Sequence, residues 1–151
     1  MPSEFLHRRR VEFAEVDSGG VMHFANYFRF MESAEHAFFR SLGLRVFERE
    51  VDGTVAWPRV RATCTYQAPL HVDDEVDVLV IVASKRRRAV ELWFAIYRGE
   101  ERVALGAFRN VCVMLDPLTG TMKSRDIPSG VDACLEVADP ERLAELPSPW
   151  R

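Results

Sequence analysis

The sequence predicts an α+β domain in which one long helix packs against an antiparallel β-sheet. Helical periodicity is confined to one segment near the N-terminus, and most of the chain after it reads as consecutive strands joined by short turns. Parallel strands would need helical crossovers, and no second long helical segment exists. Because one helix can cover a sheet face only if the sheet curls around it, we expect a curved sheet.

The N-terminal segment predicts a strand followed by a tight loop. Phe5, Val11 and Phe13 supply the apolar positions of a strand over residues 5–14. The strand leads into Asp17-Ser-Gly-Gly20, where two consecutive glycines allow tight or left-handed backbone geometry.

The long helix is predicted over residues 24–42. Apolar side chains recur there at steps of three and four and therefore share one face; they are Tyr27, Met31, Ala34, Phe38 and Leu42. Gly43 follows directly and can adopt the left-handed conformation that often ends helices.

The middle of the chain predicts a meander of strands. They are expected over residues 55–66, 76–84, 89–97 and 103–115. Pro58 makes the start of the first strand irregular or places it at an edge. The turns between the last three strands fall at residues 85–88 and 98–101.

The C-terminal stretch is acidic and rich in proline from Asp126 onward. A short helix is expected over residues 140–146. We assign residues 1–135 to the domain and residues 136–151 to an appended acidic tail.

Composition excludes several classes of protein. The 151 residues, 48% of them apolar, suit one domain that buries its core without disulfides or a structural metal. The net charge of −3 lacks the strong basic excess typical of nucleic-acid binding. The most apolar run, residues 78–83, is far shorter than the roughly 20 residues that span a membrane.

The cysteines and the N-terminus indicate a reducing compartment. Cys64, Cys112 and Cys134 are an odd number without Cys-x-x-Cys spacing, so we expect small core residues. The basic residues near the N-terminus are not followed by the apolar segment of a secretory signal. A soluble, cytoplasmic domain is therefore expected.

The chemistry is concentrated between Glu15 and Tyr27. Asp17 is followed by a glycine turn and then by the start of the predicted helix. A helix N-terminus presents unpaired N–H groups that can hold a carbonyl oxygen while negative charge develops on it. A nearby carboxylate can attack the carbonyl carbon or activate a water. On spacing alone, Asp17 could instead cap the turn while Gly19 and Gly20 merely shape the loop.

This stretch resembles the active-site segment of hotdog-fold acyl-CoA thioesterases of the 4-hydroxybenzoyl-CoA thioesterase type. The pattern Asp-x-x-Gly-Val-x-x-x-x-x-Tyr is met by Asp17, Gly20, Val21 and Tyr27. The helix continuation, residues 28–34, and the segment Tyr66-Gln-Ala-Pro69 also resemble the family, so the similarity covers residues 11–114.

The resemblance implies a fold, an assembly and a division of roles. The fold would be a hotdog, in which a curved antiparallel sheet wraps one long helix. Two copies would join edge to edge as a homodimer, often paired again into a tetramer, with active sites at the subunit interface. Asp17 would be the nucleophile or general base, and the backbone N–H of Phe24 would polarise the thioester carbonyl. Gly19 and Gly20 would shape the turn, and no metal or redox cofactor would be needed.

Departures from the pattern narrow the subgroup. Thioesterases of the Tol-Pal gene cluster commonly carry a His seven places after the Asp, where this chain has Phe24, with His23 one residue earlier. They also tend to have Tyr four places before the Asp, where this chain has Phe13. The chain therefore resembles 4-hydroxybenzoyl-CoA and 1,4-dihydroxy-2-naphthoyl-CoA thioesterases more closely. His23 could orient the substrate or bond to Asp17, or could simply cap the helix.

A basic run forms the second candidate site. Lys85-Arg86-Arg87-Arg88 could be a solvated hairpin tip. By the family resemblance, Arg86, Arg87 and Arg88 would meet the nucleotide phosphates of CoA, which guanidinium groups match bidentately. Tyr27 and Trp57 are candidates for the acyl pocket, although core packing explains such aromatic residues equally well.

The predicted function is hydrolysis of an aryl, short-chain or medium-chain acyl-CoA to the free acid and CoA. The alternative is a non-catalytic acyl-CoA-binding or regulatory module on the same fold. A hotdog dehydratase is disfavoured because the chain has no Asp-x-x-x-Pro-x-His pattern. The expected partners are the acyl-CoA substrate and further copies of the chain, with no nucleic acid or membrane.

Overall fold

The computed structural model describes residues 3–151 and has one long helix, α1 (Phe24–Ser41), wrapped by a five-stranded antiparallel sheet. The strand order is β1-β5-β6-β7-β4, so β1 and β4 form the two edges. These strands are β1 (Glu4–Arg10), β4 (Arg59–Tyr66), β5 (Glu75–Lys85), β6 (Ala89–Arg98) and β7 (Glu101–Val111).

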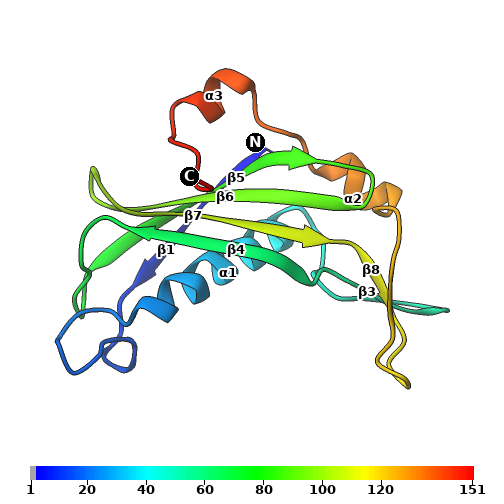
Figure 1. Cartoon of the computed structure of the whole chain (residues 1–151), viewed down its shortest axis with the longest axis horizontal. Helices are drawn as coiled ribbons and strands as arrows, with labels where there is room; N and C mark the ends of the chain where they lie inside the picture. Colours follow the sequence, from blue (N-terminus) through cyan, green and yellow to red (C-terminus); the bar gives the residue numbers. More distant parts are fainter. Residues whose placement is uncertain (1–2) are drawn as a thin grey trace.

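A smaller four-stranded sheet extends from one end of this body. Its order is β2-β3-β8-β9, and its strands are β2 (Glu48–Glu50), β3 (Gly53–Ala56), β8 (Val113–Leu115) and β9 (Met122–Ser124). Two short helices, α2 (Ser129–Cys134) and α3 (Pro140–Ala144), follow it. Figure 1 shows α1 on one side of the main sheet and α3 on the other.

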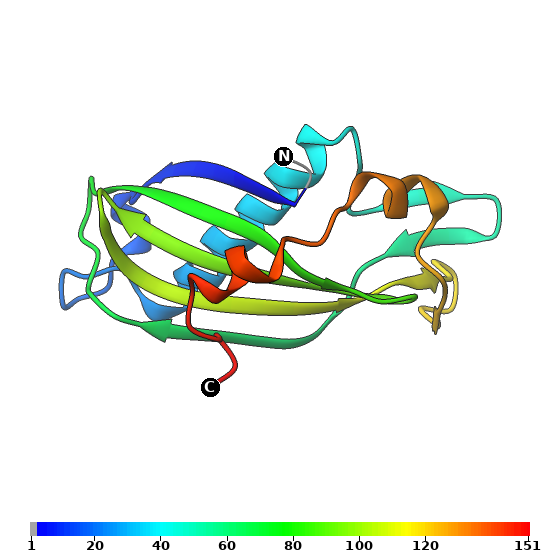
Figure 2. The ribbon, with the colours of Figure 1, turned by 90° about the horizontal axis from the view of Figure 1, so that it is seen from above.

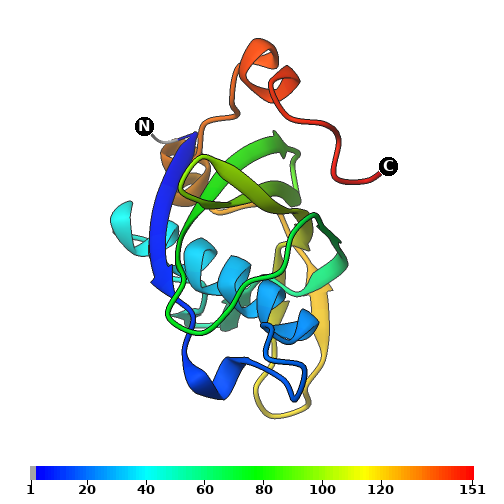
Figure 3. The ribbon, with the colours of Figure 1, turned by 90° about the vertical axis from the view of Figure 1, so that its left-hand side faces the viewer.

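The predicted α+β class and the curvature of the sheet are confirmed. Seen from its end in Figure 3, the sheet curls around α1. The helix starts at the predicted residue and ends one residue early, and Gly43 follows with a left-handed φ of 72°.

Alternation along β5, β6 and β7 sends one set of side chains toward the helix. Val78, Val80 and Phe94 belong to the same buried cluster as Phe30 and Phe38 of α1. Burying each large apolar side chain contributes roughly 1.5–3 kcal/mol.

The helix approaches β7 closely at a glycine. A Cβ at Gly106 would lie only 2.6 Å from the Sδ of Met31. It would also lie 2.8 Å from the backbone oxygen of Thr63, so a larger residue would force both the Met31 side chain and the backbone of β4 to shift.

The opposite set of side chains faces outward and is covered by the tail. Leu79, Ile81, Ala95 and Leu105 form a second cluster with Ala138, Leu143 and Leu146. Figure 2 shows α3 lying across this outer face. Residues 138–146 of the predicted tail thus pack on the outer face of the sheet.

Near the end of the tail, Trp150 contacts two residues of the main sheet. The indole Nε1 of Trp150 donates to Glu91 at 2.7 Å, and the guanidinium of Arg61 lies 4.3 Å from the Trp150 ring centroid. Trp150 therefore lies next to edge strand β4, which carries Arg61.

Three predicted strands end or break earlier than expected. The first strand was predicted to reach Ala14 but ends at Arg10, and residues 13–15 form a 3₁₀ turn in which Phe13 is 84% exposed. The predicted strand 55–66 is interrupted at residues 57–58. Pro58 cannot donate a backbone hydrogen bond, and the chain there passes from β3 in the smaller sheet to β4 in the main sheet. The strand 103–115 is interrupted at Cys112, because β8 leaves the main sheet to pair with β3.

A buried carboxyl group, which no pattern in the sequence indicated, joins three elements at the start of β4. Glu35 of α1 is fully buried, and its Oε1 accepts a hydrogen bond from Asn110 Nδ2 of β7 at 2.8 Å. Its Oε2 lies 2.8 Å from Arg59 Nη2 of β4. Desolvation outweighs these partners and raises the pKa of Glu35 to about 7. The three side chains tie the edge strand to the helix.

We predict that the free energy of unfolding of the wild type falls, relative to Glu35→Gln, as pH rises from about 5 to about 7.5. The folded-state pKa of Glu35 lies above its ordinary value of 4.5, so the folded protein holds a proton that the unfolded chain has already lost in this range. The difference should be on the order of 1–3 kcal/mol, measured by urea unfolding at several pH values.

Glu75→Gln provides the control, because Glu75 also pairs with an arginine, Arg10, but its side chain is exposed and far from Glu35 in the sequence. Its unfolding curve should follow that of the wild type across the pH range. Parallel pH profiles for wild type and Glu35→Gln would contradict the assignment of a raised pKa to Glu35.

Candidate active site

A cleft of about 400 Å³ lies at the first turn of α1. Three segments line it: the loop before the helix, the start of the helix, and the end of β4 with the residues after it. The lining residues are Asp17, Val21, Met22, Phe24, Tyr27, Tyr66, Gln67, Ala68 and Pro69. Asp17 is the one charged side chain among them.

The loop that carries Asp17 is a tight turn built on glycine. Gly20 N donates to Asp17 O at 3.0 Å, and Asp17 N donates to Val21 O at 2.9 Å. Gly20 has a φ of 82°, which a residue with a Cβ rarely adopts. The Asp17 Oδ1 accepts from Gly19 N at 2.8 Å, and a Cβ at Gly19 would lie 3.1 Å from that oxygen. Both predicted glycines therefore support the position of the carboxylate.

Backbone and side-chain hydrogen bonds anchor this loop to the body. Met22 N donates to Leu70 O at 2.7 Å, and His23 N donates to Glu15 O at 2.9 Å. The same Glu15 oxygen accepts from the side-chain nitrogen of Asn26 at 2.8 Å. The loop thus enters the helix along a fixed path.

The helix start leaves one donor open. His23 is the N-cap of α1, because its Nδ1 accepts from Ala25 N at 3.2 Å and its carbonyl accepts from Asn26 N at 2.9 Å. Within residues 3–151, the N–H of Phe24 has no hydrogen-bond partner. It is a free donor at the positive end of the helix dipole.

Two tyrosines form an aromatic wall of the cleft. The rings of Tyr27 and Tyr66 meet edge to face, with centroids 4.8 Å apart and planes at 86°. The Tyr66 hydroxyl donates to the carbonyl oxygen of Phe24 at 3.0 Å. Desolvation raises the pKa of both phenols, that of Tyr66 to about 12, so both remain neutral hydrogen-bond donors.

The structure brings together Asp17, Gly20, His23, Phe24 and Tyr27 but not Trp57. Trp57 is 5% exposed and packs on Phe39, with ring centroids 6.2 Å apart. In the single chain it is a core residue outside the cleft.

The basic hairpin lies far from the cleft within one chain. Arg86, Arg87 and Arg88 connect β5 to β6, at the end of the sheet opposite the Asp17 loop (Figure 1). The 11 residues of β5 run between the two ends, a span of roughly 30 Å. Arg87 and Arg88 both lie within 3.0 Å of the Asp126 carboxylate, whereas no side-chain partner is found for Arg86 among the described residues.

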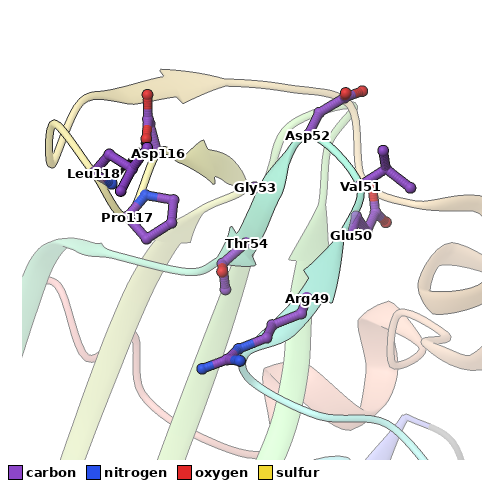
Figure 4. A pocket seen from close by; sticks show the side chains of 9 residues that line it. All are labelled: Arg49, Glu50, Val51, Asp52, Gly53, Thr54, Asp116, Pro117 and Leu118. Carbon is purple, nitrogen blue, oxygen red and sulfur yellow. Dashed lines mark hydrogen bonds between the residues drawn. The ribbon is translucent and has the colours of Figure 1, made fainter.

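A larger hollow, of about 470 Å³, lies in the smaller sheet. Figure 4 shows its charged side chains on separate strands and turns, where Arg49, Asp52 and Asp116 do not converge on one point. It contains none of the site residues predicted from the sequence. The cleft at the head of α1 is therefore the candidate active site.

A sheet wrapped around one helix, with the N-terminus of that helix open to a cleft, is the architecture of hotdog-fold thioester hydrolases. The chain belongs to the thioesterase-like superfamily, whose family model matches residues 11–147. The expected membership of the hotdog acyl-CoA thioesterases is thus confirmed, and the protein is a thioester hydrolase.

Two relatives are similar to this chain in sequence, and one solved structure is similar to it in fold. The chain is 32% identical over 100 residues to an Aquifex aeolicus protein provisionally named an esterase, covering 66% of this chain and 77% of that protein. It is 27% identical over 128 residues to a 1,4-dihydroxy-2-naphthoyl-CoA hydrolase of Thermosynechococcus vestitus, covering 78% and 88%. A gentisyl-coenzyme A thioesterase structure superposes with a TM-score of 0.75 at 24% identity, covering 87% of this chain and 100% of the other.

No helix within residues 3–151 has the length and apolar character needed to cross a membrane. The cytoplasmic location stays a prediction.

We predict that His23→Ala lowers the free energy of unfolding by about 1 kcal/mol, because the variant loses the N-cap of α1. His23→Asn should retain most of the stability and the activity, since Asn is a preferred N-cap residue. Urea unfolding and thioester hydrolysis of both variants check this. A folded His23→Asn enzyme without activity would show instead that the imidazole takes part in the chemistry.

Proposed function

We propose that this protein hydrolyses aryl-CoA thioesters to the free acid and CoA at the cleft beside Asp17. The observation that carries the proposal is the composition of the cleft. Asp17 and Phe24 both line the cleft, most of its other lining residues are apolar or aromatic, and the Phe24 N–H has no hydrogen-bond partner within residues 3–151. An activated ester requires this pair, a nucleophile or base on one side of its carbonyl and a donor on the other.

The chemistry follows from these two groups. The thioester carbonyl oxygen accepts from the Phe24 N–H, which stabilises the negative charge that develops there. As nucleophile, Asp17 attacks the carbonyl carbon, expels the CoA thiolate and forms an anhydride that water then hydrolyses. As general base, Asp17 removes a proton from the water that attacks the same carbon, and the thiolate leaves with the proton.

The walls of the cleft favour an aromatic acyl group. Tyr66 presents an exposed ring that can stack on another ring or meet it edge to face, and the buried ring of Tyr27 supports it from behind. Several relatives are named 1,4-dihydroxy-2-naphthoyl-CoA hydrolases, and the acyl group in that name is a bicyclic aromatic ring system. The aromatic cleft wall and the names of these relatives favour aryl esters over short-chain and medium-chain acyl esters.

A homodimer through β4 accounts for the distance between the cleft and the arginines. The outer side of β4 is an unpaired edge with Val60 60% exposed and two arginines, whereas edge strand β1 carries three consecutive arginines, and such charges hinder strand pairing. Antiparallel pairing of β4 with its copy sets the start of one strand beside the end of the other. The β5–β6 hairpin of one protomer then lies toward the Asp17 cleft of its partner.

This pairing would let one CoA molecule reach both sites. Its thioester would lie in one protomer's cleft and its phosphates at the other protomer's hairpin. Association of two dimers into a tetramer stays a prediction; it would have to use a surface other than the sheet face that the tail covers.

We predict that Asp17→Asn lowers kcat by roughly 10²–10⁴-fold, because it removes the nucleophile or base and leaves the walls unchanged. Thiol release would be measured with benzoyl-, hydroxybenzoyl-, naphthoyl- and medium-chain CoA esters, and the aryl esters should be the best substrates. Asp52→Asn, in the larger hollow of the smaller sheet, is the matched control and should keep full activity.

Undiminished activity of Asp17→Asn would remove Asp17 from the mechanism. Calorimetry with the same esters distinguishes an enzyme from a non-catalytic binding module. Tight binding by the wild type without any thiol release would indicate the binding module.

We predict that Arg86→Gln raises KM for CoA esters roughly 3–10-fold with little change in kcat, because a free guanidinium can pair with a phosphate. Asp126→Asn should lower KM, since it releases Arg87 and Arg88. Arg8→Gln, on the opposite edge strand, removes the same charge and should leave KM unchanged. Equal KM values for wild type and Arg86→Gln would exclude Arg86 from CoA binding.

A further inference from the structure

The peptide group that joins Phe24 to Ala25 is held from two sides. Its carbonyl oxygen accepts from the Tyr66 hydroxyl at 3.0 Å, and its N–H donates to His23 Nδ1 at 3.2 Å. His23 belongs to the loop before α1, and Tyr66 is the last residue of β4. The first turn of the helix is therefore fixed both to the loop that carries Asp17 and to the opposite wall of the cleft.

The preceding peptide group, which joins His23 to Phe24, carries the open donor. Its carbonyl accepts from Asn26 N at 2.9 Å. In a trans peptide the N–H points opposite to the carbonyl, so this bond sets the direction of the Phe24 N–H along the helix axis. It does not set the distance between the helix start and the wall formed by β4. The Tyr66 hydroxyl supplies that restraint.

We propose that Tyr66 is a positioning residue for thioester hydrolysis, whose hydroxyl holds the first turn of α1 so that the Phe24 N–H is presented to the substrate carbonyl. The inference rests on the proposed function. Tyr66 would act by positioning Phe24 and would not itself take part in making or breaking bonds. Small displacements of such a donor reduce catalysis because its stabilisation depends on alignment with the developing oxyanion.

The environment of Tyr66 suits this role. Its ring is held edge to face against the buried ring of Tyr27, so the hydroxyl has a defined direction. The phenol is protonated near neutral pH and can donate to a carbonyl oxygen, which a phenolate could not, and desolvation raises its pKa further. Tyr66 is 44% exposed and lines the cleft, so its ring would also contact a bound substrate.

The test is Tyr66→Phe, which removes the hydroxyl and keeps the ring contact with Tyr27. We expect kcat for an aryl-CoA ester to fall about tenfold while KM stays within twofold, because the cleft walls are unchanged and the donor is less well held. Tyr97→Phe is the matched control: Tyr97 lies in the cluster on the outer sheet face, and its variant should have wild-type kcat and KM.

A spectroscopic readout separates positioning from a general loss of structure. In the Asp17→Asn background, bound 4-hydroxybenzoyl-CoA should absorb at longer wavelength than the free ester, because the Phe24 N–H polarises its carbonyl. Adding Tyr66→Phe should reduce this shift without changing Kd. His23→Ala releases the same peptide from the other side and should also lower kcat at constant KM, and His23→Asn should restore it.

The possible failures are distinguishable. An active wild type with unchanged kcat in Tyr66→Phe, or with an undiminished absorption shift in the double variant, would overturn this inference and leave the proposed function intact, whatever His23→Ala does. A raised KM with unchanged kcat in Tyr66→Phe would also overturn it, since Tyr66 would then act as a substrate contact. Absence of hydrolysis by the wild type with every ester would overturn the proposed function and this inference together.

Discussion

The candidate site depends on how the chain enters its one long helix. An α-helix cannot satisfy its first N–H groups internally, so each must find another partner or stay open. Here the His23 side chain and carbonyl accept from the N–H groups of Ala25 and Asn26. Within residues 3–151 the N–H of Phe24 has no partner, and Phe24 lines the same cleft as Asp17. The glycine turn makes this entry possible, because Gly20 adopts a backbone conformation that other residues rarely adopt. The sheet then has only to bring an aromatic wall opposite this helix end.

Features encoded by local pattern were predictable. The three- and four-residue spacing of apolar side chains located α1 to within one residue, and the turn residues separated β5, β6 and β7 correctly. The segment from Asp17 to Tyr27 pointed to the cleft because its glycines and its helix start are local properties. Family membership was predictable for the same reason, since the motif lies within a continuous stretch of the chain.

Features that depend on contacts between distant segments were not predictable. Glu35 gives no sign in the sequence that it is buried, because its partners Arg59 and Asn110 are 24 and 75 residues away. The pairing of Arg87 and Arg88 with Asp126 likewise becomes visible only when β9 and the segment after it return beside the hairpin. Trp57 shows the converse: an aromatic residue expected near the substrate is buried against Phe39, and composition could not distinguish the two environments.

The contacts of Trp150 with Glu91 and Arg61 determine where a polypeptide added at the C-terminus would leave the surface. The last residue of the chain leaves the surface beside β4, whereas the N-terminal strand runs along the opposite edge of the sheet (Figure 2). A fusion or affinity tag at the C-terminus would therefore crowd the edge at which two protomers are expected to meet. The same tag attached before β1 would extend from the far margin of the molecule and leave that edge clear.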